Sequence, residues 1–300
     1  MSPSSENQKN REEDILDQIK LLGGKPTVVR KNEKIIRLSF TVPSGFDVRK
    51  LNYFKNLQKL HVWGIQRLPP LENLQKLKDL SIFSSDLTTI SPINHLVNLE
   101  LLDLGGTGVT NISPLSNLKQ LKVLLLDATD VTDLSPLANL QALKTLHLME
   151  TPVTDLSPLK TVKNLQELRL DNTDVVDLSA LKGLSRLEHL SLENTGVSDL
   201  SPIRRLKDLR FLDIDGTRVS KLPRMYCEKL EQFSLRDTNV SDLTPLEGLK
   251  NLRVLNIRST NVSDLTPLEK LENLEAVFLF GTNISKEDEK VQSLEKKGIS

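Results

Sequence analysis

Hydrophobic and polar positions alternate along this chain in a pattern that repeats about every 22 residues. One unit runs from Leu143 to Leu159, and its threonine, Thr151, has a counterpart in most other units. A fixed period of this length indicates a solenoid of stacked units. The steps between counterparts are 22 residues each, with one step of 21 between Thr217 and Thr238. The counterparts are Ser85, Thr107, Thr129, Thr173, Thr195, Thr217, Thr238, Thr260 and Thr282.

Each unit divides into a short strand and a turn. In Leu146-His147-Leu148 the leucines face one side of the strand and His147 faces the other. Ser157-Pro158 then begins a helical or 3₁₀ turn, in which the serine is expected to cap free amides. One unit cannot bury its own leucines, so the units must stack strand on strand in a parallel sheet. An aspartate that precedes each turn is expected to bind turn amides, and its positions are Asp133, Asp155, Asp177, Asp199, Asp242 and Asp264.

The unit L-x-x-L-x-L-x-x-T-x-V-x-D-L-x-P-L resembles the 22-residue leucine-rich repeat of bacterial internalins and of phosphatase-regulator-type proteins, over roughly residues 35–284. The resemblance implies an α/β repeat solenoid: a concave parallel sheet, a convex side of short 3₁₀ turns and loops, and helical caps at both ends. It also implies a non-enzymatic protein-interaction scaffold. The general preference for right-handed crossovers predicts a right-handed superhelix. One departure is threonine where the family usually has asparagine, since a hydroxyl forms fewer hydrogen bonds with the turn backbone.

The segments that flank the repeats differ in composition. Residues 1–10 are polar and are predicted to be a disordered tail. Residues 11–34 are predicted to form an N-terminal cap, with a helix from Arg11 to Leu22. Residues 35–284 are the leucine-rich repeats, with twelve strand units, and 285–300 form a C-terminal cap helix in which Ser285 and Asp288 nearly match a capping box. Residues 221–229 break the repeat, which is compatible either with a bend or with a protruding loop.

Composition limits the choice of partners and compartment. Lys and Arg total 40 and Asp and Glu total 40, so no net charge favours nucleic acid or a membrane surface. The single cysteine, Cys227, excludes a disulfide framework within the chain. No run approaches 18 apolar residues, and residues 1–11 lack the apolar core of a signal peptide. We expect a cytoplasmic protein with no membrane insertion, although internalins are exported and a route without a cleavable signal is compatible with these features.

Outward strand residues are expected to form ladders on the concave face, with neighbours about 4.8 Å apart. These ladders are acidic in the middle and end in aromatic residues. Like charges on adjacent strands repel each other, so we expect Asp171, Glu193 and Asp215 to destabilise the sheet unless a basic partner is present. The proposed partner-binding residues are Trp63, Phe83, Asp103, Asp127, His147, Met149, Glu150, Arg169, Asp171, Glu193, Phe211, Asp213, Asp215, Arg236, Arg258, Phe278 and Phe280.

The hypothesis is therefore a concave face that binds a basic segment of another protein, anchored by the aromatic ends. The simpler interpretation is that the charged ladders are only solvated and that the aromatics pack against the caps. A regulatory or substrate-recruiting subunit of an enzyme complex, such as a phosphatase, is the alternative function. A cation- or glycan-binding surface module is a third. The sequence leaves the oligomeric state open.

Catalytic and cofactor chemistry has little support in the sequence. His189, Ser191 and Asp213 share a face, but no glycine-rich turn offers an oxyanion hole. Asp171, Glu193 and Asp215 have the oxygen ligands of a hard cation, but a flat ladder lacks enclosing carbonyls. No zinc spacing, P-loop or dinucleotide motif occurs, so no cofactor and no enzyme activity are predicted. Cys227 is expected to be a buried small hydrophobe.

Overall fold

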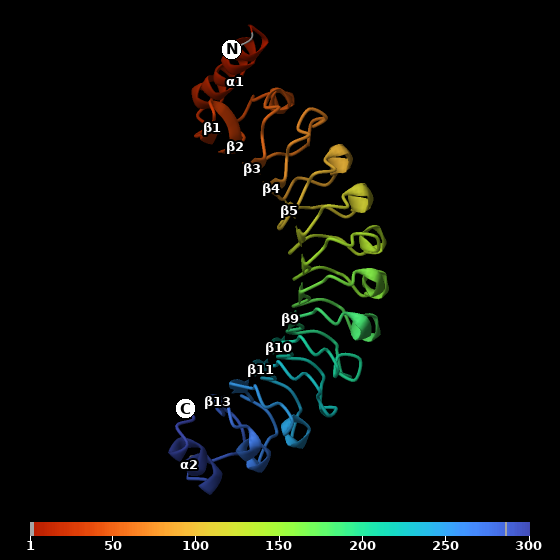
Figure 1. Ribbon diagram of the computed structural model, residues 1–300, viewed down its shortest axis with the longest axis vertical. Helices are drawn as coiled ribbons and strands as arrows, with labels where there is room; N and C mark the ends of the chain where they lie inside the picture. The colour runs from red at the N-terminus through yellow and green to blue at the C-terminus, as the bar shows by residue number, and fades with distance from the viewer. Residues whose placement is uncertain (1–2, 286) are drawn as a thin grey trace. The chain divides into compact units, whose positions relative to one another are not determined.

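The computed structural model describes residues 3–285 and 287–300, with side chains described from residue 6 onward. The chain divides into two units, Met1–Leu143 and Lys144–Ser300, and each is described by itself. In both units the strands lie along one side and the turns along the other (Figure 1). We call the side chains that project from the strands away from the core the sheet face, and the opposite surface the turn side.

Unit 1 begins with a helix and a hairpin that close the first coil. Helix α1 spans Pro3–Leu21 and buries Ile15, Leu16 and Ile19 against the repeats. It ends at Gly23, whose φ of +89° suits the left-handed conformation that stops a helix. Strands β1 (Thr27–Lys31) and β2 (Lys34–Thr41) pair antiparallel through a two-residue turn. Both turn residues, Asn32 and Glu33, have positive φ, as a tight hairpin of this kind requires.

The predicted disordered tail over residues 1–10 is wrong from Pro3 onward, because these residues are helical. The polar side chains of this segment reach the first coil and the hairpin. Gln8 Nε2 donates to the Tyr53 carbonyl oxygen at 3.4 Å, and Lys9 Nζ lies 3.1 Å from Glu33 Oε2. The Arg11 guanidinium lies 5.2 Å from the centroid of the Tyr53 ring. These long-range contacts, with the good helix propensity of Glu, Gln and Lys, hold a segment that composition alone suggested was unfolded.

The remaining strands of unit 1 run parallel and in register. Leu38 pairs with Leu60 and Leu60 with Leu80, so the predicted repeat spacing is already present in β2. The 3₁₀ turns return the chain to the next strand. The elements are η1 Val48–Tyr53, β3 Lys59–Trp63, β4 Asp79–Phe83, η2 Ser91–His95, β5 Leu101–Asp103, η3 Ser113–Asn117, β6 Val123–Leu125 and η4 Ser135–Leu137.

Unit 2 repeats the same coil until its C-terminal helix. Its strands are parallel, and each central residue, such as Leu146 and Leu168, pairs with the same position of the next coil. With β2 to β6, its strands make the predicted twelve repeat strands among the residues described. The elements are β7 Thr145–His147, η5 Ser157–Thr161, β8 Glu167–Arg169, η6 Ser179–Gly183, β9 His189–Ser191, β10 Phe211–Asp213, β11 Gln232–Ser234, η7 Thr244–Leu246, β12 Val254–Asn256, η8 Thr266–Lys270, β13 Ala276–Phe278 and α2 Glu289–Lys296.

The core is a stack of aliphatic side chains contributed once per coil. In the coil that starts at β7, Leu146, Leu148, Val153 and Leu159 are all 0% exposed. Each of these side chains packs between coils, because a single coil has no other surface to bury it. The helices close this stack, and no helix in the described part of the chain is long and apolar enough to cross a bilayer.

The turn aspartates have the predicted structural role. Asp155 Oδ1 accepts a hydrogen bond from the Ser157 backbone N–H at 2.8 Å, and Asp177 does the same with Ser179. The prediction that the serine caps the turn is wrong, because the Ser157 hydroxyl donates to Asp155 Oδ2 at 2.8 Å. The Asp155 carboxylate therefore accepts from both the backbone N–H and the hydroxyl of Ser157. The serine hydroxyl stabilises the carboxylate and does not cap a backbone amide. These hydrogen bonds, led by the one from the backbone N–H, hold the pKa of Asp155 below its ordinary value.

The repeated threonine closes the bend after each strand. Thr151 is buried, and its hydroxyl donates to the Leu148 carbonyl oxygen at 2.6 Å. The residue before it, Glu150, has φ of +56°, and the corresponding residues of neighbouring coils are also left-handed. This single bond to a carbonyl three residues back agrees with the expectation that threonine forms fewer bonds than asparagine.

The C-terminal cap also differs in detail from its prediction. Asp288 is the N-cap of α2 and accepts a hydrogen bond from the Lys290 backbone N–H at 2.8 Å, so the expected capping box with Ser285 as N-cap is wrong. Helix α2 buries Val291 and Leu294. Ser300 then pairs with the last strand, since its carbonyl accepts from Val277 N–H at 2.9 Å.

We predict that Thr151→Val lowers the free energy of unfolding by about 1–3 kcal/mol, because it removes the hydroxyl donor to the buried Leu148 carbonyl. Valine preserves the shape of the side chain. Urea denaturation followed by circular dichroism measures the change. Thr154→Val, the same substitution at an exposed position of the same coil, is the control. Equal effects of the two substitutions would contradict a role for this hydrogen bond.

Candidate functional site

The sheet face carries the residues that the alternation of the sequence placed there. In β7 the central Leu146 is buried, whereas Thr145 and His147 on either side of it are partly exposed. The same alternation holds in β8, where Leu168 is buried between Glu167 and Arg169. All seventeen proposed partner-binding residues lie on β-strands or in the residues that directly follow them. Whether they bind a partner stays a prediction, but their surroundings can be described within each unit.

Two aromatic rings form an exposed platform in unit 1. Trp63 and Phe83 occupy the same register position on β3 and β4. Their ring centroids are 5.3 Å apart with an interplanar angle of 19°, so the rings are stacked on each other. Trp63 keeps 40% of its surface exposed. Phe83 is half-buried beside it, so the pair offers one exposed ring backed by a second, an apolar surface of the kind that anchors protein partners.

Next to this platform, unit 1 contains a buried polar cluster that the sequence pattern did not reveal. Asp79 is 8% exposed and lies 2.9 Å from Lys59 Nζ and 3.2 Å from His61 Nε2. The register of β3 and β4 sets Lys59 opposite Asp79, with His61 two residues further along β3, and this pairing brings the two basic side chains to the carboxylate. Asp79 is therefore held by its neighbours and is not available to a partner.

Asp103 and Asp127, on the sheet face of unit 1, are half-buried acids that are more accessible than Asp79. The Asp103 carboxylate accepts a hydrogen bond from Gly105 N–H at 3.0 Å. Partial burial raises the pKa of Asp103 above its ordinary value, and the nearby Asp127 carboxylate contributes in the same direction. Glycine at position 105 leaves the sheet face without a side chain between Phe83 and Asp127.

In unit 2 two of the three ladder acids bind the backbone of the chain itself. Asp171 is 5% exposed, and its Oδ1 accepts hydrogen bonds from the Ser191 hydroxyl and from Glu193 N–H, the latter at 3.0 Å. Asp215 is 7% exposed and accepts from Ser234 Oγ and Arg236 N–H, at 2.5 and 2.7 Å. Each carboxylate thus ties the end of its own strand to the next coil.

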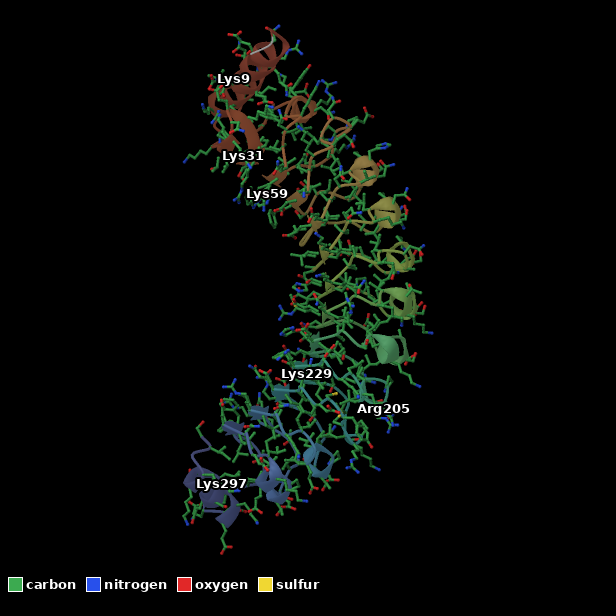
Figure 2. The ribbon with its side chains drawn as sticks, in the orientation of Figure 1. Lys9, Lys31, Lys59, Arg205, Lys229 and Lys297 are labelled. Atoms are coloured by element: carbon green, nitrogen blue, oxygen red, sulfur yellow. The ribbon has the colours of Figure 1, made fainter. Side chains whose placement is uncertain are left out.

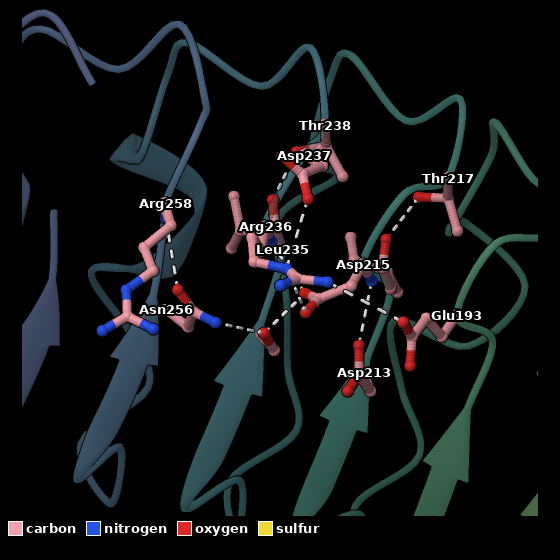
Figure 3. Close-up of polar contacts among 12 residues, drawn as sticks. Glu193, Asp213, Asp215, Thr217, Leu235, Arg236, Asp237, Thr238, Asn256 and Arg258 are labelled. Atoms are coloured by element: carbon pink, nitrogen blue, oxygen red, sulfur yellow. Dashed lines mark hydrogen bonds and ion pairs between the residues drawn. The ribbon is translucent and has the colours of Figure 1, made fainter. Parts of the chain in front are cut away.

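These contacts correct the expectation that the acidic ladder only destabilises the sheet. Figure 3 shows the Arg236 side chain between Asp215 and Glu193. Arg236 Nε lies 3.3 Å from Asp215 Oδ2, and its Nη2 lies 3.8 Å from Glu193 Oε1. Arg169 Nε lies 3.7 Å from Asp171 Oδ2. The backbone donors and the arginines offset the repulsion between neighbouring carboxylates, so no partner is needed for that purpose.

Among the neighbouring carboxylates Asp171, Asp213 and Asp215, Asp213 is the one whose negative charge is least offset by hydrogen-bond donors. Its carboxylate accepts one backbone bond, from Asp215 N–H at 2.9 Å (Figure 3). Burial, reinforced by the charges of Asp215, Glu193 and Asp171, raises the pKa of Asp213 to about 7. This carboxyl group consequently exchanges its proton near neutral pH.

Other predicted residues also contact their neighbours. His147 Nε2 lies 2.9 Å from Glu167 Oε1, and the Arg258 guanidinium lies 4.7 Å from the centroid of the Phe278 ring. The Phe211 ring lies 6.3 Å from His189. Met149 is partly exposed on the same face, and Glu150 at the end of its strand is exposed.

The aromatic residues at the end of unit 2 border a hollow. Phe278 is 39% exposed and Phe280 is 83% exposed. The hollow, of about 490 Å³, lies between the last coil and helix α2. It is lined mainly by apolar side chains, which include Val277, Leu279, Ile284, Val291, Leu294 and Ile299. The expectation that these aromatics pack against the cap fits Phe280 poorly, since most of its surface remains exposed.

The catalytic and cation alternatives find no support in this geometry. The Ser191 hydroxyl donates to Asp171 and so is committed to a carboxylate rather than to His189. Asp171 and Asp215 use their oxygens on backbone amides and hydroxyls. Within the described residues no group of three or more His, Cys, Asp or Glu side chains is arranged to hold a metal ion.

Cys227 lies in the irregular coil and is fully buried. Its Sγ lies 3.7 Å from the Ile203 carbonyl oxygen, and burial raises the pKa of its thiol to about 11. The thiolate is the reactive form, so a thiol with this pKa is unreactive near neutral pH. Leu222 and Met225 are buried beside it, which shows that residues 221–229 pack into the stack and do not protrude as a loop.

We predict that Asp213→Asn raises the melting temperature at pH 8.5 and has a much smaller effect at pH 5. The folded-state pKa of Asp213 lies above its value in the unfolded chain, so its contribution to stability is present at low pH and is lost as the pH rises through about 7. Asparagine cannot ionise and can still accept the Asp215 N–H bond. Differential scanning calorimetry across this pH range measures the effect. Asp174→Asn, at an exposed position, is the control, and equal pH profiles for the two variants would contradict the burial of charge at Asp213.

Comparison with known proteins agrees with the repeat architecture. A family model described as Leucine Rich repeats (2 copies) matches residues 163–205 and 228–270. Comparison with curated proteins finds no match.

Solved structures of bacterial repeat proteins are similar over most of the chain. An internalin (inlF) of Listeria monocytogenes str. 4b F2365 is 27% identical with a TM-score of 0.77, covering 89% of this chain and 80% of its own. Internalin C2 of the same strain is 33% identical with a TM-score of 0.55, covering 71% of this chain and 83% of its own. A leucine-rich repeat protein of Leptospira interrogans is 28% identical with a TM-score of 0.75, covering 87% of this chain and 75% of its own. From its repeats, its fold and these likenesses, the chain belongs to the leucine-rich repeat family and resembles the internalins within it.

Proposed function

We propose that the chain is a protein-recognition scaffold whose sheet face binds a partner that presents a basic segment. The observation that carries this proposal is the stacked pair Trp63 and Phe83, which leaves an aromatic surface in solvent. Burying exposed tryptophan and phenylalanine rings supplies much of the free energy at protein interfaces. Within a folded coil, this pair has no structural role comparable to that of the buried leucines.

The acidic residues that support the proposal are fewer than the sequence suggested. Asp171 and Asp215 bind the chain's own backbone and are excluded as contacts. Asp103 and Asp127 in unit 1, and Glu150 and Glu193 in unit 2, are carboxylates on the sheet face that keep exposed surface. They favour a basic partner through charge complementarity, which increases the association rate and selects among partners.

A scaffold function also fits the side chains found on this face. Ser191, whose hydroxyl a hydrolase would need free as its nucleophile, donates that hydroxyl to Asp171. The internalin likeness favours binding over catalysis, although a shared fold does not fix function. A cytoplasmic location and a role as a subunit of an enzyme complex stay predictions.

We predict that Trp63→Ala combined with Phe83→Ala weakens partner binding at least about thirtyfold, because each lost anchor costs roughly 1–2 kcal/mol or more. Affinity capture with quantitative mass spectrometry identifies proteins held by the wild-type chain, and titration calorimetry with the recovered partner measures the loss. Val97→Ala, at an exposed apolar position outside the sheet face, is the control.

We also predict that Glu150→Lys combined with Glu193→Lys weakens the same complex and reverses its salt dependence. Attraction between the acidic face and a basic segment is screened by salt, whereas the altered face would repel that segment. Glu72→Lys combined with Glu272→Lys makes the same charge change at exposed positions outside the sheet face. Binding that is indifferent to both the aromatic and the charge substitutions would refute the proposal, provided that circular dichroism shows the variants to be folded.

A further inference from the structure

The irregular coil of unit 2 reverses a charge that six other coils share. Four residues after its threonine, each of these six coils has an aspartate, as in Asp199 after Thr195 and Asp242 after Thr238. At the same offset from Thr217 the chain has Lys221. The Ser-Pro or Thr-Pro that follows the aspartate in most of these coils is replaced by Pro223-Arg224. The turn side of this coil is therefore positive where its neighbours are negative.

Arginines from two coils converge here on one exposed tyrosine. The Arg205 guanidinium lies 5.4 Å from the centroid of the Tyr226 ring, and the Arg224 guanidinium lies 5.7 Å from it. Tyr226 is 40% exposed, and its backbone N–H donates to the Arg204 carbonyl oxygen at 2.8 Å. Figure 2 shows Arg205 on the turn side of unit 2. Both guanidinium groups are thus held against the same exposed ring.

These guanidinium groups form no ion pair among the described residues, although the pKa of Asp199 is lowered first by the Ser201 hydrogen bonds and then, to a smaller extent, by the charge of Arg204. Among the residues that the structure describes, Arg204, Arg205 and Arg224 have no carboxylate within ion-pair distance. The nearby acids have other partners. Asp199 accepts from Ser201 N–H at 2.8 Å, and Glu247 pairs with Lys270 at 2.8 Å. Lys229, in the same coil, is neutralised by Asp208 at 2.8 Å.

We propose that Arg205, Arg224 and Tyr226, with Arg204 and Lys221 beside them, form a second binding site that takes an acidic peptide segment. Each guanidinium has a planar fork of donors that matches a carboxylate, and stacking on Tyr226 fixes the plane of that fork in advance. The exposed ring offers an apolar contact for the stems of glutamate or aspartate side chains. This surface is separate from the sheet face. It takes an acidic segment, whereas the sheet face is proposed to take a basic one.

The size of the patch favours a peptide over larger polyanions. Nucleic acid and anionic bilayers bind through extended basic surfaces, typically of four to eight or more charges spread along the contact. Here, among the described residues, only the guanidinium groups of Arg205 and Arg224 lie over the ring, and the chain as a whole has equal numbers of basic and acidic residues. Two or three carboxylates spaced along one peptide are enough to occupy these arginines.

The test is fluorescence anisotropy with a fluorescein-labelled octaglutamate peptide and the full chain. We expect saturable binding that weakens at least about tenfold in the variant Arg205→Gln combined with Arg224→Gln. Arg205→Lys combined with Arg224→Lys keeps the charge but lacks the fork, and it is expected to lose most of the same affinity. Lys221→Asp restores the aspartate of the regular repeat and is also expected to weaken binding.

The matched control is Lys160→Gln combined with Lys182→Gln, which removes two positive charges from the same turn position of two regular coils. Binding should remain unchanged in this variant. Urea denaturation of each variant separates loss of binding from loss of folding, and Tyr226→Phe, which retains the ring, should bind like the wild type.

Three results would overturn the proposal. The first is the absence of saturable octaglutamate binding by the folded wild-type chain up to about 1 mM peptide, weaker than specific complexes show. The second is an equal loss of affinity in the lysine control, which would indicate a general charge effect. The third is tighter, arginine-dependent binding to phosphatidylserine vesicles or to a single-stranded oligonucleotide, which would assign the site to a membrane or a nucleic acid.

Discussion

The structure depends on one constraint: the leucines of a coil are buried only by the coils on either side. Leu146, Leu168 and Leu190 are each 0% exposed, yet the strands that hold them are three residues long. Such strands have no stability of their own, so backbone pairing and aliphatic packing between coils form together. The first and last coils need other cover. Helix α1 and the hairpin of β1 and β2 supply it in unit 1, and helix α2 supplies it in unit 2.

This constraint leaves functional chemistry to side chains that point away from the stack, and many of those are needed for structure. The acidic residues show this clearly. Asp155 holds a turn amide, and Asp171 holds the amide of a neighbouring coil. Both are carboxylates at regular positions, and both look available in the sequence. The residues that we propose for recognition include the stacked rings of Trp63 and Phe83 and exposed carboxylates such as Glu150, for which no such backbone bond is needed.

The one coil that departs from the repeat also keeps its buried positions and differs at its surface. Its core positions are still filled, since Met225 and Cys227 are buried where other coils have leucine or valine. Its surface positions change completely, with Lys221 in place of aspartate and Tyr226 between two arginines. Packing therefore tolerates the irregular segment, and the surface over it has a lysine where six other coils have an aspartate.

The sequence by itself determined the period, the strand of each coil, the outward positions and the structural role of the turn aspartates, because these follow from local alternation and turn chemistry. Tertiary structure alone decided the rest. The polar residues of α1 are ordered by contacts with Tyr53 and Glu33, far away in the chain. The burial of Asp79, Asp171 and Asp215 depends on which side chains and amides the register brings beside them. Local sequence specifies which face a side chain occupies, whereas the distance between atoms of adjacent coils specifies whether it is free.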